Sequence, residues 1–318
     1  MVSRTLEVPN QYQTVPLIRA LTPDDVEHLR LGPRDRDSES TVREVLREFP
    51  GRSVWAPEWN EFVLIAPWRH RQEIATVQSL SAVRFADHLL RTAVERCRAA
   101  GDSLLLSIEF DEVRHPAFHH RIGFELLEEI VALELSRPFP TTVASSRSYR
   151  RFDPYDREAL DQVVALDHRA FPWLWHNSRA EFLSYTTTPG VEIYLRFDAG
   201  RLTSYVGFTW FAGWGHIDRI AVAPDSQHRG FGRETLAFAV DFLARRGARR
   251  IGLSTQYANG RSQRLYARFG FHRAIDHDYR IYGARLSHPA TSIQPLGRLE
   301  RQKKHRTIHR MEGSSPDG

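Results

Sequence analysis

The chain has 318 residues, of which 41% are hydrophobic and 26% are charged. This length is about twice that of a typical domain and the composition suits a buried core, so we expect two globular domains and exclude a fibrous or wholly disordered chain. Cys97 is the only cysteine, which excludes an intrachain disulfide and a cysteine-based metal site. Because the first ten residues hold no apolar stretch typical of a signal peptide, we expect a cytoplasmic protein without a membrane segment.

The formal net charge of +5 is concentrated near the end of the chain. Residues 287–318 contain six Lys or Arg against three acids and no aromatic residue, a composition that predicts a disordered basic tail. The remainder is close to neutral and has no zinc-finger or RNA-recognition pattern, so nucleic acid is not an expected partner.

In the first half, apolar residues recur at helical spacing over 83–97, and Gly101 stops the pattern. Residues 104–108 follow as an apolar run that predicts a strand. The next segment, 117–124, reads Ala-Phe-His-His-Arg-Ile-Gly-Phe. The order is helix, strand, short helix.

The second half has the same order with more elements before it. We predict strands over 149–152, 191–197, 202–211, 216–222, 250–255, 271–275 and 279–286, and helices over 156–168, 179–185, 233–246 and 261–268. Asp198-Ala199-Gly200 is a hairpin signal, and Gly247 is placed to end a helix.

The segment 264–271, Arg-Leu-Tyr-Ala-Arg-Phe-Gly-Phe, resembles 117–124 and stands at the same point of its half. We infer an internal duplication. The predicted organisation is a first domain at 1–140, a linker at 141–147, a second domain at 148–286, and the tail at 287–318.

Residues 222–232, Val-Ala-Pro-Asp-Ser-Gln-His-Arg-Gly-Phe-Gly, lie between a predicted strand and a predicted helix. A helix N-terminus offers unpaired N–H groups and a partial positive charge, and glycines let an anion approach the backbone closely. The spacing fits neither the dinucleotide-binding fingerprint nor the Walker loop, so the motif predicts a phosphate cradle of another kind.

This motif resembles the signature of the GNAT superfamily of acetyl-CoA-dependent N-acetyltransferases: Gln or Arg, two residues, Gly, one residue, then Gly or Ala. A second element of that family, an asparagine, a tyrosine and then Gly-Phe, is matched by Asn259, Tyr266 and Gly270-Phe271. The resemblance covers about 140 residues. It implies an α/β (α+β) fold of two tandem GNAT-like domains, each a mixed, mostly antiparallel sheet flanked by helices.

The resemblance also implies which residues bind acetyl-CoA, the co-substrate. The backbone of Ile220, Ala221 and Val222 would pair with the pantetheine amides. The pyrophosphate would lie against Gln227, His228, Arg229, Gly230, Phe231, Gly232 and Arg233, with Asn259 and Ser262 nearby. Tyr266 would donate a proton to the departing thiolate during direct transfer in a ternary complex. No metal is implied.

The catalytic base is left open between His216, Asp218 and a chain of water molecules. The two side chains alternate onto one face of the predicted strand 216–222, and a histidine titrates near neutral pH. Each side chain is equally well explained as a polar residue at the edge of the sheet.

Two further questions stay open. The first is whether the aromatic residues at 171–175 and 210–214 line an amine-acceptor pocket or instead bury the junction between the halves. No glycine lies between Gly51 and Gly101, so the first half lacks the cradle and is expected to be a degenerate, structural copy. A non-catalytic acyl-CoA-sensing or protein-interaction module is the alternative function. The amine acceptor and a homodimer are not determined by the sequence.

Overall fold

The computed structural model describes residues 16–31, 38–110, 114, 116–139 and 148–286. The predicted linker at 141–147 and the predicted tail at 287–318 lie outside these residues. In the first half the elements are β1 (Arg19–Ala20), η1 (Pro23–His28), α1 (Glu39–Glu48), β2 (Val54–Ala56), β3 (Glu61–Trp68), β4 (Arg71–Ser81), α2 (Ala86–Ala99), β5 (Leu104–Phe110), α3 (Pro116–Arg121) and β6 (Glu125–Ser136).

The second half repeats this order. Its elements are β7 (Tyr149–Arg151), α4 (Arg157–Ala170), η3 (Trp173–Trp175), α5 (Arg179–Thr187), β8 (Val191–Asp198), β9 (Arg201–Phe211), β10 (Trp214–Val222), η4 (Pro224–Ser226), α6 (Phe231–Arg245), β11 (Arg250–Gln256), α7 (Gly260–Arg268), β12 (His272–Arg273), η5 (Ile275–His277) and β13 (Tyr279–Arg285). The predicted elements of this half are present, although the strand predicted over 271–275 shortens to two residues and α6 begins two residues early.

The strands form one mixed sheet in the order β1-β2-β3-β4-β5-β13-β6-β11-β10-β9-β8-β7, and β12 also pairs with β6. Only β4 with β5 and β10 with β11 are parallel among the described strands, and each parallel pair is joined through one helix, α2 or α6. The two crossovers occupy equivalent positions in the two halves. The predicted fold, tandem units with a mostly antiparallel sheet flanked by helices, is therefore confirmed.

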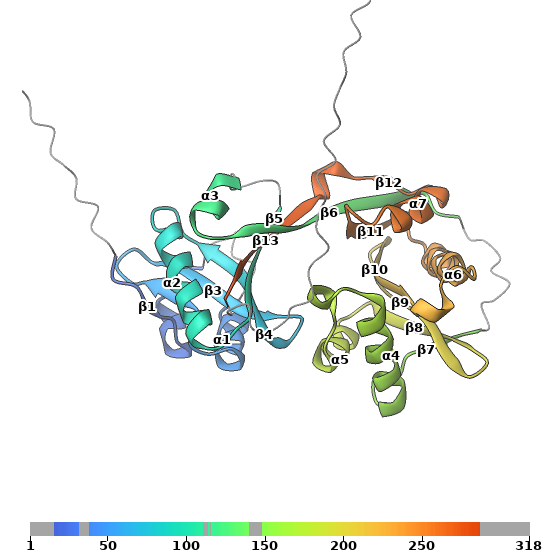
Figure 1. Cartoon of the computed structure of the whole chain (residues 1–318), viewed down its shortest axis with the longest axis horizontal. Coiled ribbons are helices and arrows are strands. Elements are labelled where there is room, and N and C mark those ends of the chain that lie inside the picture. Colours follow the sequence, from blue (N-terminus) through green and yellow to red (C-terminus); the bar gives the residue numbers. More distant parts are fainter. Residues whose placement is uncertain (1–15, 32–37, 111–113, 115, 140–147, 287–318) are drawn as a thin grey trace, which may run out of the picture.

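The two halves exchange their last strands. β13, from the end of the second half, lies between β5 and β6 of the first half. β6 continues past β13 into the second half, where it pairs with β11 from Ile130 to Ser136. Figure 1 shows β6 as one long strand that passes from one half to the other. The sheet is shared, although the predicted boundary at residue 148 divides the chain.

Helices cover both faces of the second half's sheet. On one face, α6 and α7 pack through Leu236, Leu243 and Tyr266 onto β10 and β11. On the other face, α4 and α5 pack through Leu160 and Phe182 onto β8 and β9 (Figure 1). In the described ranges, no helix is long and apolar enough to cross a membrane.

Ile281 of β13 is expected to be important for the stability of both halves. It is fully buried, in a core cluster with Leu104 and Leu106 of the first half and Leu174 of the second. Ile281→Ala should lower the free energy of unfolding by about 2–5 kcal/mol, because it leaves a cavity where the halves meet. Urea denaturation followed by circular dichroism measures this loss.

The control is Ile275→Ala, since Ile275 is 70% exposed and should contribute less than about 0.5 kcal/mol. Equal, small losses for the two variants would contradict the shared core.

Candidate active site

Strands β10 and β11 separate halfway along their length. They pair from Trp214 with Arg250 to Ile217 with Leu253. Beyond that point, among the described residues, β10 pairs only with β9 and β11 only with β6. The register of β10 against β9 also shifts between Ile217 and Arg219, which places a bulge where the strands separate. The inner backbone edge of residues 219–222 therefore faces a gap in the sheet.

The loop after β10 ends at an open helix N-terminus. Gly230 is the N-cap of α6, has a left-handed backbone (φ 89°) and receives no side-chain capping hydrogen bond from any described residue. His228 is also left-handed, at φ 64°. A Cβ placed on Gly230 would find no atom within 4 Å. The first N–H groups of this 15-residue helix are therefore open to an anion.

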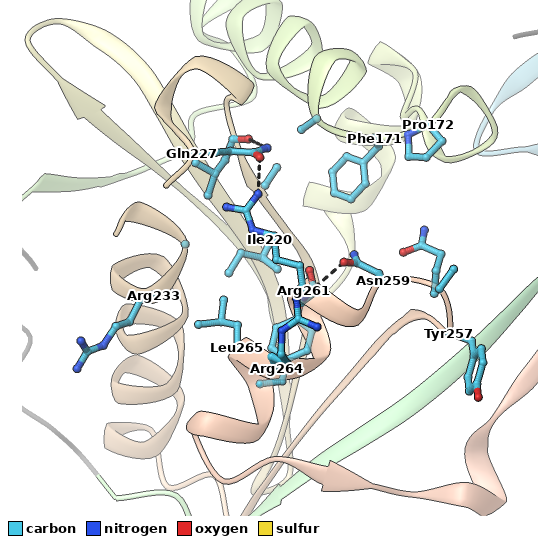
Figure 2. Close-up of a pocket in the computed structure, with 18 of the residues that line it drawn as sticks. Phe171, Pro172, Ile220, Gln227, Arg233, Tyr257, Asn259, Arg261, Arg264 and Leu265 are labelled. Atoms are coloured by element: carbon cyan, nitrogen blue, oxygen red, sulfur yellow. Dashed lines mark hydrogen bonds between the residues drawn. The ribbon is translucent and has the colours of Figure 1, made fainter. Parts of the chain in front are cut away.

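The gap between the strands and this helix end open into one cavity of about 750 Å³. Figure 2 shows 18 of the lining residues, and those it labels come from the loop after α4, β10, the loop after β10, α6, the segment after β11 and α7. Ten of the twelve predicted cofactor-binding residues line it: Ile220, Ala221, Val222, Gln227, His228, Gly230, Gly232, Arg233, Asn259 and Ser262. Tyr266, the predicted proton donor, lines the same cavity.

The side chains of the other two predicted residues point elsewhere. Arg229 lies 3.6 Å from the Asp198 carboxylate, and the buried Phe231 ring packs beneath the Arg196 guanidinium at 4.0 Å. Only their backbone N–H groups remain available to the predicted cradle.

Hydrogen bonds within the cavity hold the predicted residues in place. Gln227 accepts a hydrogen bond from Arg261 at 2.7 Å and donates one to the carbonyl of Val222 at 3.3 Å (Figure 2). The Asn259 side chain caps α7 by accepting from the Ser262 N–H at 3.1 Å. The strand end, the loop and α7 are thus linked around the cavity.

Tyr266 is buried in α7, with 5% of its surface exposed. Burial raises the pKa of Tyr266 to about 12, against the opposing effect of a hydrogen bond with Ser262. Its hydroxyl is therefore protonated at neutral pH and able to donate a proton.

Two glutamates of β6 also line the cavity and were not predicted. Glu128 and Glu129 belong to the first half of the chain and reach this site because β6 extends beside β11. No sequence motif marks them, because only the strand pairing brings them here.

The comparisons with known proteins agree with this geometry. Residues 160–271 match the model of the acetyltransferase (GNAT) family. Residues 160–271 therefore form a GNAT-family domain within the second half of the chain.

Mycothiol acetyltransferases are among the similar curated proteins. The one from Clavibacter michiganensis is 31% identical over 203 residues, covering 57% of this chain and 63% of its own. The one from Acidimicrobium ferrooxidans is 30% identical over 160 residues, covering 46% of this chain and 49% of its own. The chain thus spans between about half and just under two thirds of the length of these relatives.

Two solved structures share the fold over most of the chain. A GCN5-related N-acetyltransferase from Sphaerobacter thermophilus has a TM-score of 0.54 at 18% identity and covers 86% of this chain and 96% of its own. A tandem GNAT protein from the clavulanic acid biosynthesis pathway has a TM-score of 0.54 at 16% identity, and the match covers 86% of this chain and 99% of its own. At these identities the likeness concerns the fold alone.

His216 and Asp218, the predicted bases of the GNAT site, are together but do not line the cavity. Their side chains lie 2.6 Å apart, and Asp218 also accepts hydrogen bonds from Thr209 at 2.7 Å and from the Tyr185 hydroxyl. Burial, with the Asp218 charge, raises the pKa of Tyr185. Hydrogen bonds through Asp218 connect the pair to β9 and α5, outside the residues that line the cavity. Their catalytic role therefore stays a prediction.

A buried ion pair fixes the loop of residues 171–177, of which Phe171 and Pro172 line the cavity. The Asp167 carboxylate accepts from Arg219 Nε at 2.6 Å, from the Asn177 N–H at 2.9 Å and from the Tyr205 hydroxyl. Arg219 also donates to the carbonyl of Trp175. The bulge on β10 and the loop are therefore joined through one carboxylate.

Asp167→Asn is expected to lower the free energy of unfolding by about 3–5 kcal/mol, because Arg219 would keep a buried charge without its partner. Chemical denaturation measures the loss. Asp161→Asn is the matched control on the same helix, since its carboxylate is 66% exposed and its ion pair with Arg179 should contribute about 1 kcal/mol or less. A loss below about 1 kcal/mol for Asp167→Asn would show that the ion pair does not fix the loop.

The aromatic residues were expected either to line an acceptor pocket or to bury the junction between the halves, and different residues of the loop do each. Phe171 and Pro172 line the cavity, whereas Trp173, Leu174 and Trp175 meet the β3–β4 turn of the first half. The Trp68 indole donates to the carbonyl of Leu174 at 2.8 Å, and Arg71 donates to that of Trp173 at 2.6 Å. At the far edge, Phe211 and Trp214 are exposed. The first half thus braces one wall of the cavity.

The equivalent loop of the first half is occupied by the chain itself. The buried Glu61 carboxylate accepts hydrogen bonds from the backbone N–H groups of Val83, Arg84 and Phe85 at 2.9–3.0 Å. These are the amides that stand where the cradle lies in the second half. The Glu61 carboxylate therefore already accepts hydrogen bonds from these amides.

His119, at the position equivalent to Tyr266, is a packed core residue. It is fully buried and stacks on Tyr282 of β13 with ring centroids 4.0 Å apart. Burial lowers the pKa of His119 to about 4. It is therefore neutral at neutral pH.

Proposed function

We propose that this chain is an N-acetyltransferase with one working active site, which transfers the acetyl group of acetyl-CoA directly to an amine in a ternary complex. The observation that carries the proposal is the single cavity that joins the open α6 N-terminus, the gap between β10 and β11, and Tyr266. Residues 148–286 carry this catalytic unit, and residues 1–140 support it as a degenerate copy.

Each part of the cavity has a task in this reaction. The N–H groups of residues 230–233, with the positive end of α6, bind the pyrophosphate. The edge of β10 from Ile220 to Val222 pairs with the pantetheine amides, as an added strand would. This arrangement brings the thioester to the bulge, and the Tyr266 hydroxyl protonates the thiolate as the C–S bond breaks.

The acceptor is an amine that enters beside Phe171 and Pro172. Since two relatives are named mycothiol acetyltransferases, mycothiol-related amines belong first in an acceptor panel. A non-catalytic acyl-CoA-sensing module would bind the same cofactor but release no thiol.

Calorimetry and a thiol-release assay together test the proposal. We expect one acetyl-CoA site per chain, and release of free CoA that depends on an added amine. Binding without amine-dependent release across the panel would favour the sensing module, and absence of binding would refute both functions.

A further inference from the structure

The basic and acidic residues that line the cavity come from different elements of the fold. The arginines that line it, Arg233, Arg261, Arg264 and Arg268, come from α6 and α7. Its only acidic lining residues, among those the structure describes, are Glu128 and Glu129 of β6. The anionic nucleotide is attracted to the arginines, and the glutamates can instead attract a cationic group such as an ammonium.

The two glutamates differ in their partners. Glu129 lies 3.3 Å from Arg280 Nε and its carbonyl accepts from the Tyr257 N–H, so its charge is compensated and its backbone is held. Glu128 has no ion pair with any described residue. A carboxylate without a cationic partner, in a cavity that must admit a protonated amine, attracts that amine.

Glu128 is also half-buried among apolar groups. It pairs across the sheet with Ile281, and alternation places it on the same face as Ile130, which packs with Trp175 and Leu174. The titratable or charged groups near it are Tyr279 on β13, Arg69 beyond Tyr279 in the first half, and Glu129 on its own strand. Burial raises the pKa of Glu128, despite the Trp175 indole beside it. A raised pKa makes the carboxylate a stronger base.

We infer that Glu128, supplied by the first half through the strand exchange, binds the acceptor's ammonium group and removes its proton. This inference rests on the proposed function and names the base that the sequence left open. The first half then contributes a catalytic group to the site of the second.

The proton balance is complete without another reactant. The Glu128 carboxylate takes one proton from the ammonium and later releases it to solvent. The neutral nitrogen attacks the thioester carbonyl, the C–N bond forms and the C–S bond breaks. Tyr266 gives its proton to the thiolate and recovers one from the nitrogen. The products are the acetylated amine, free CoA and one proton.

The test compares Glu128→Gln with wild type in the thiol-release assay. We expect kcat/KM for the amine to fall about 10²–10⁴-fold at neutral pH, the range of general base catalysis. The dissociation constant of acetyl-CoA and the melting temperature should not change. The deficit should shrink as the pH rises, because more of the amine is then already neutral. A purely structural role would not give this recovery.

Glu125→Gln is the matched control, since it removes the same charge from an exposed position of the same strand and should keep full activity. Full activity of Glu128→Gln, with a large loss in Asp218→Asn, would overturn the inference and assign the base to β10. Loss of acetyl-CoA binding in Glu128→Gln would also overturn it, by showing a structural role. If wild type fails to bind acetyl-CoA, the proposed function itself fails.

Discussion

Replacing Gly230 with glutamate should abolish acetyl-CoA binding. The backbone of Gly230 is left-handed, and a side chain there would extend into open space at the α6 N-terminus. A carboxylate about 4 Å from a pyrophosphate charge costs about 4 kcal/mol at the effective dielectric of a protein surface. We therefore expect calorimetry to show a dissociation constant for acetyl-CoA that is larger by a factor of at least ~100.

Gly247→Glu is the matched control at the other end of α6. Gly247 has nearly the same backbone angle (φ 84° against 89°) and equally open surroundings, but does not line the cavity. Both variants carry a similar backbone strain of about 1–2 kcal/mol, so their melting temperatures should fall by similar amounts. If both variants keep wild-type affinity, the phosphates do not bind at this helix end.

Tyr266→Phe should lower kcat by about 10²–10⁴-fold without weakening acetyl-CoA binding. The substitution keeps the buried ring and removes only the proton that the thiolate needs. Since burial raises the pKa of Tyr266 to about 12, the donor stays protonated through neutral pH, and wild-type activity should be lost only as the pH rises through that value. Stopped-flow thiol release with saturating acetyl-CoA measures the effect.

Tyr149→Phe provides the control for that experiment. Tyr149 is also buried, and its hydroxyl donates to Thr235 at 3.0 Å outside the cavity. It should cost stability, about 1 kcal/mol for a lost hydrogen bond, and leave kcat unchanged. Unchanged turnover in Tyr266→Phe would remove the tyrosine from the reaction and leave it as a core residue.

The sequence predicted the second half's elements well because local chemistry determines them. The turn at Asp198-Ala199-Gly200 and the end of α6 at Gly247 depend on left-handed residues, which the structure shows at Ala199, Gly200 and Gly247. The loop at 222–232 was predicted as a phosphate cradle because of its glycines, and a Cβ at Gly230 would indeed meet no atom within 4 Å at the helix end.

The strand exchange could not be predicted from the sequence. The sequence predicts a strand at 279–286 but does not specify which neighbour it pairs with, and a sheet closed within each half would be compatible with the same sequence. The exchange carries Glu128 and Glu129 from the first half into the cavity. A motif search confined to the second half would therefore miss them.

The role of residues 171–175 also could not be predicted from the sequence alone. The aromatic residues 171–175 were equally compatible with a pocket and with a buried junction, and the choice between them depends on the β3–β4 turn of the first half, which is distant in the sequence. His216 and Asp218 share one face, as alternation predicted, but the bulge and α5 surround them with Thr209 and Tyr185.

The most direct test of the account is a crystal structure of the full chain with acetyl-CoA. We predict one cofactor per chain, with its pyrophosphate on the backbone N–H groups of residues 230–233, its pantetheine in the gap between β10 and β11, and its thioester facing Tyr266. A nucleotide bound elsewhere, with these amides unoccupied, would contradict the account.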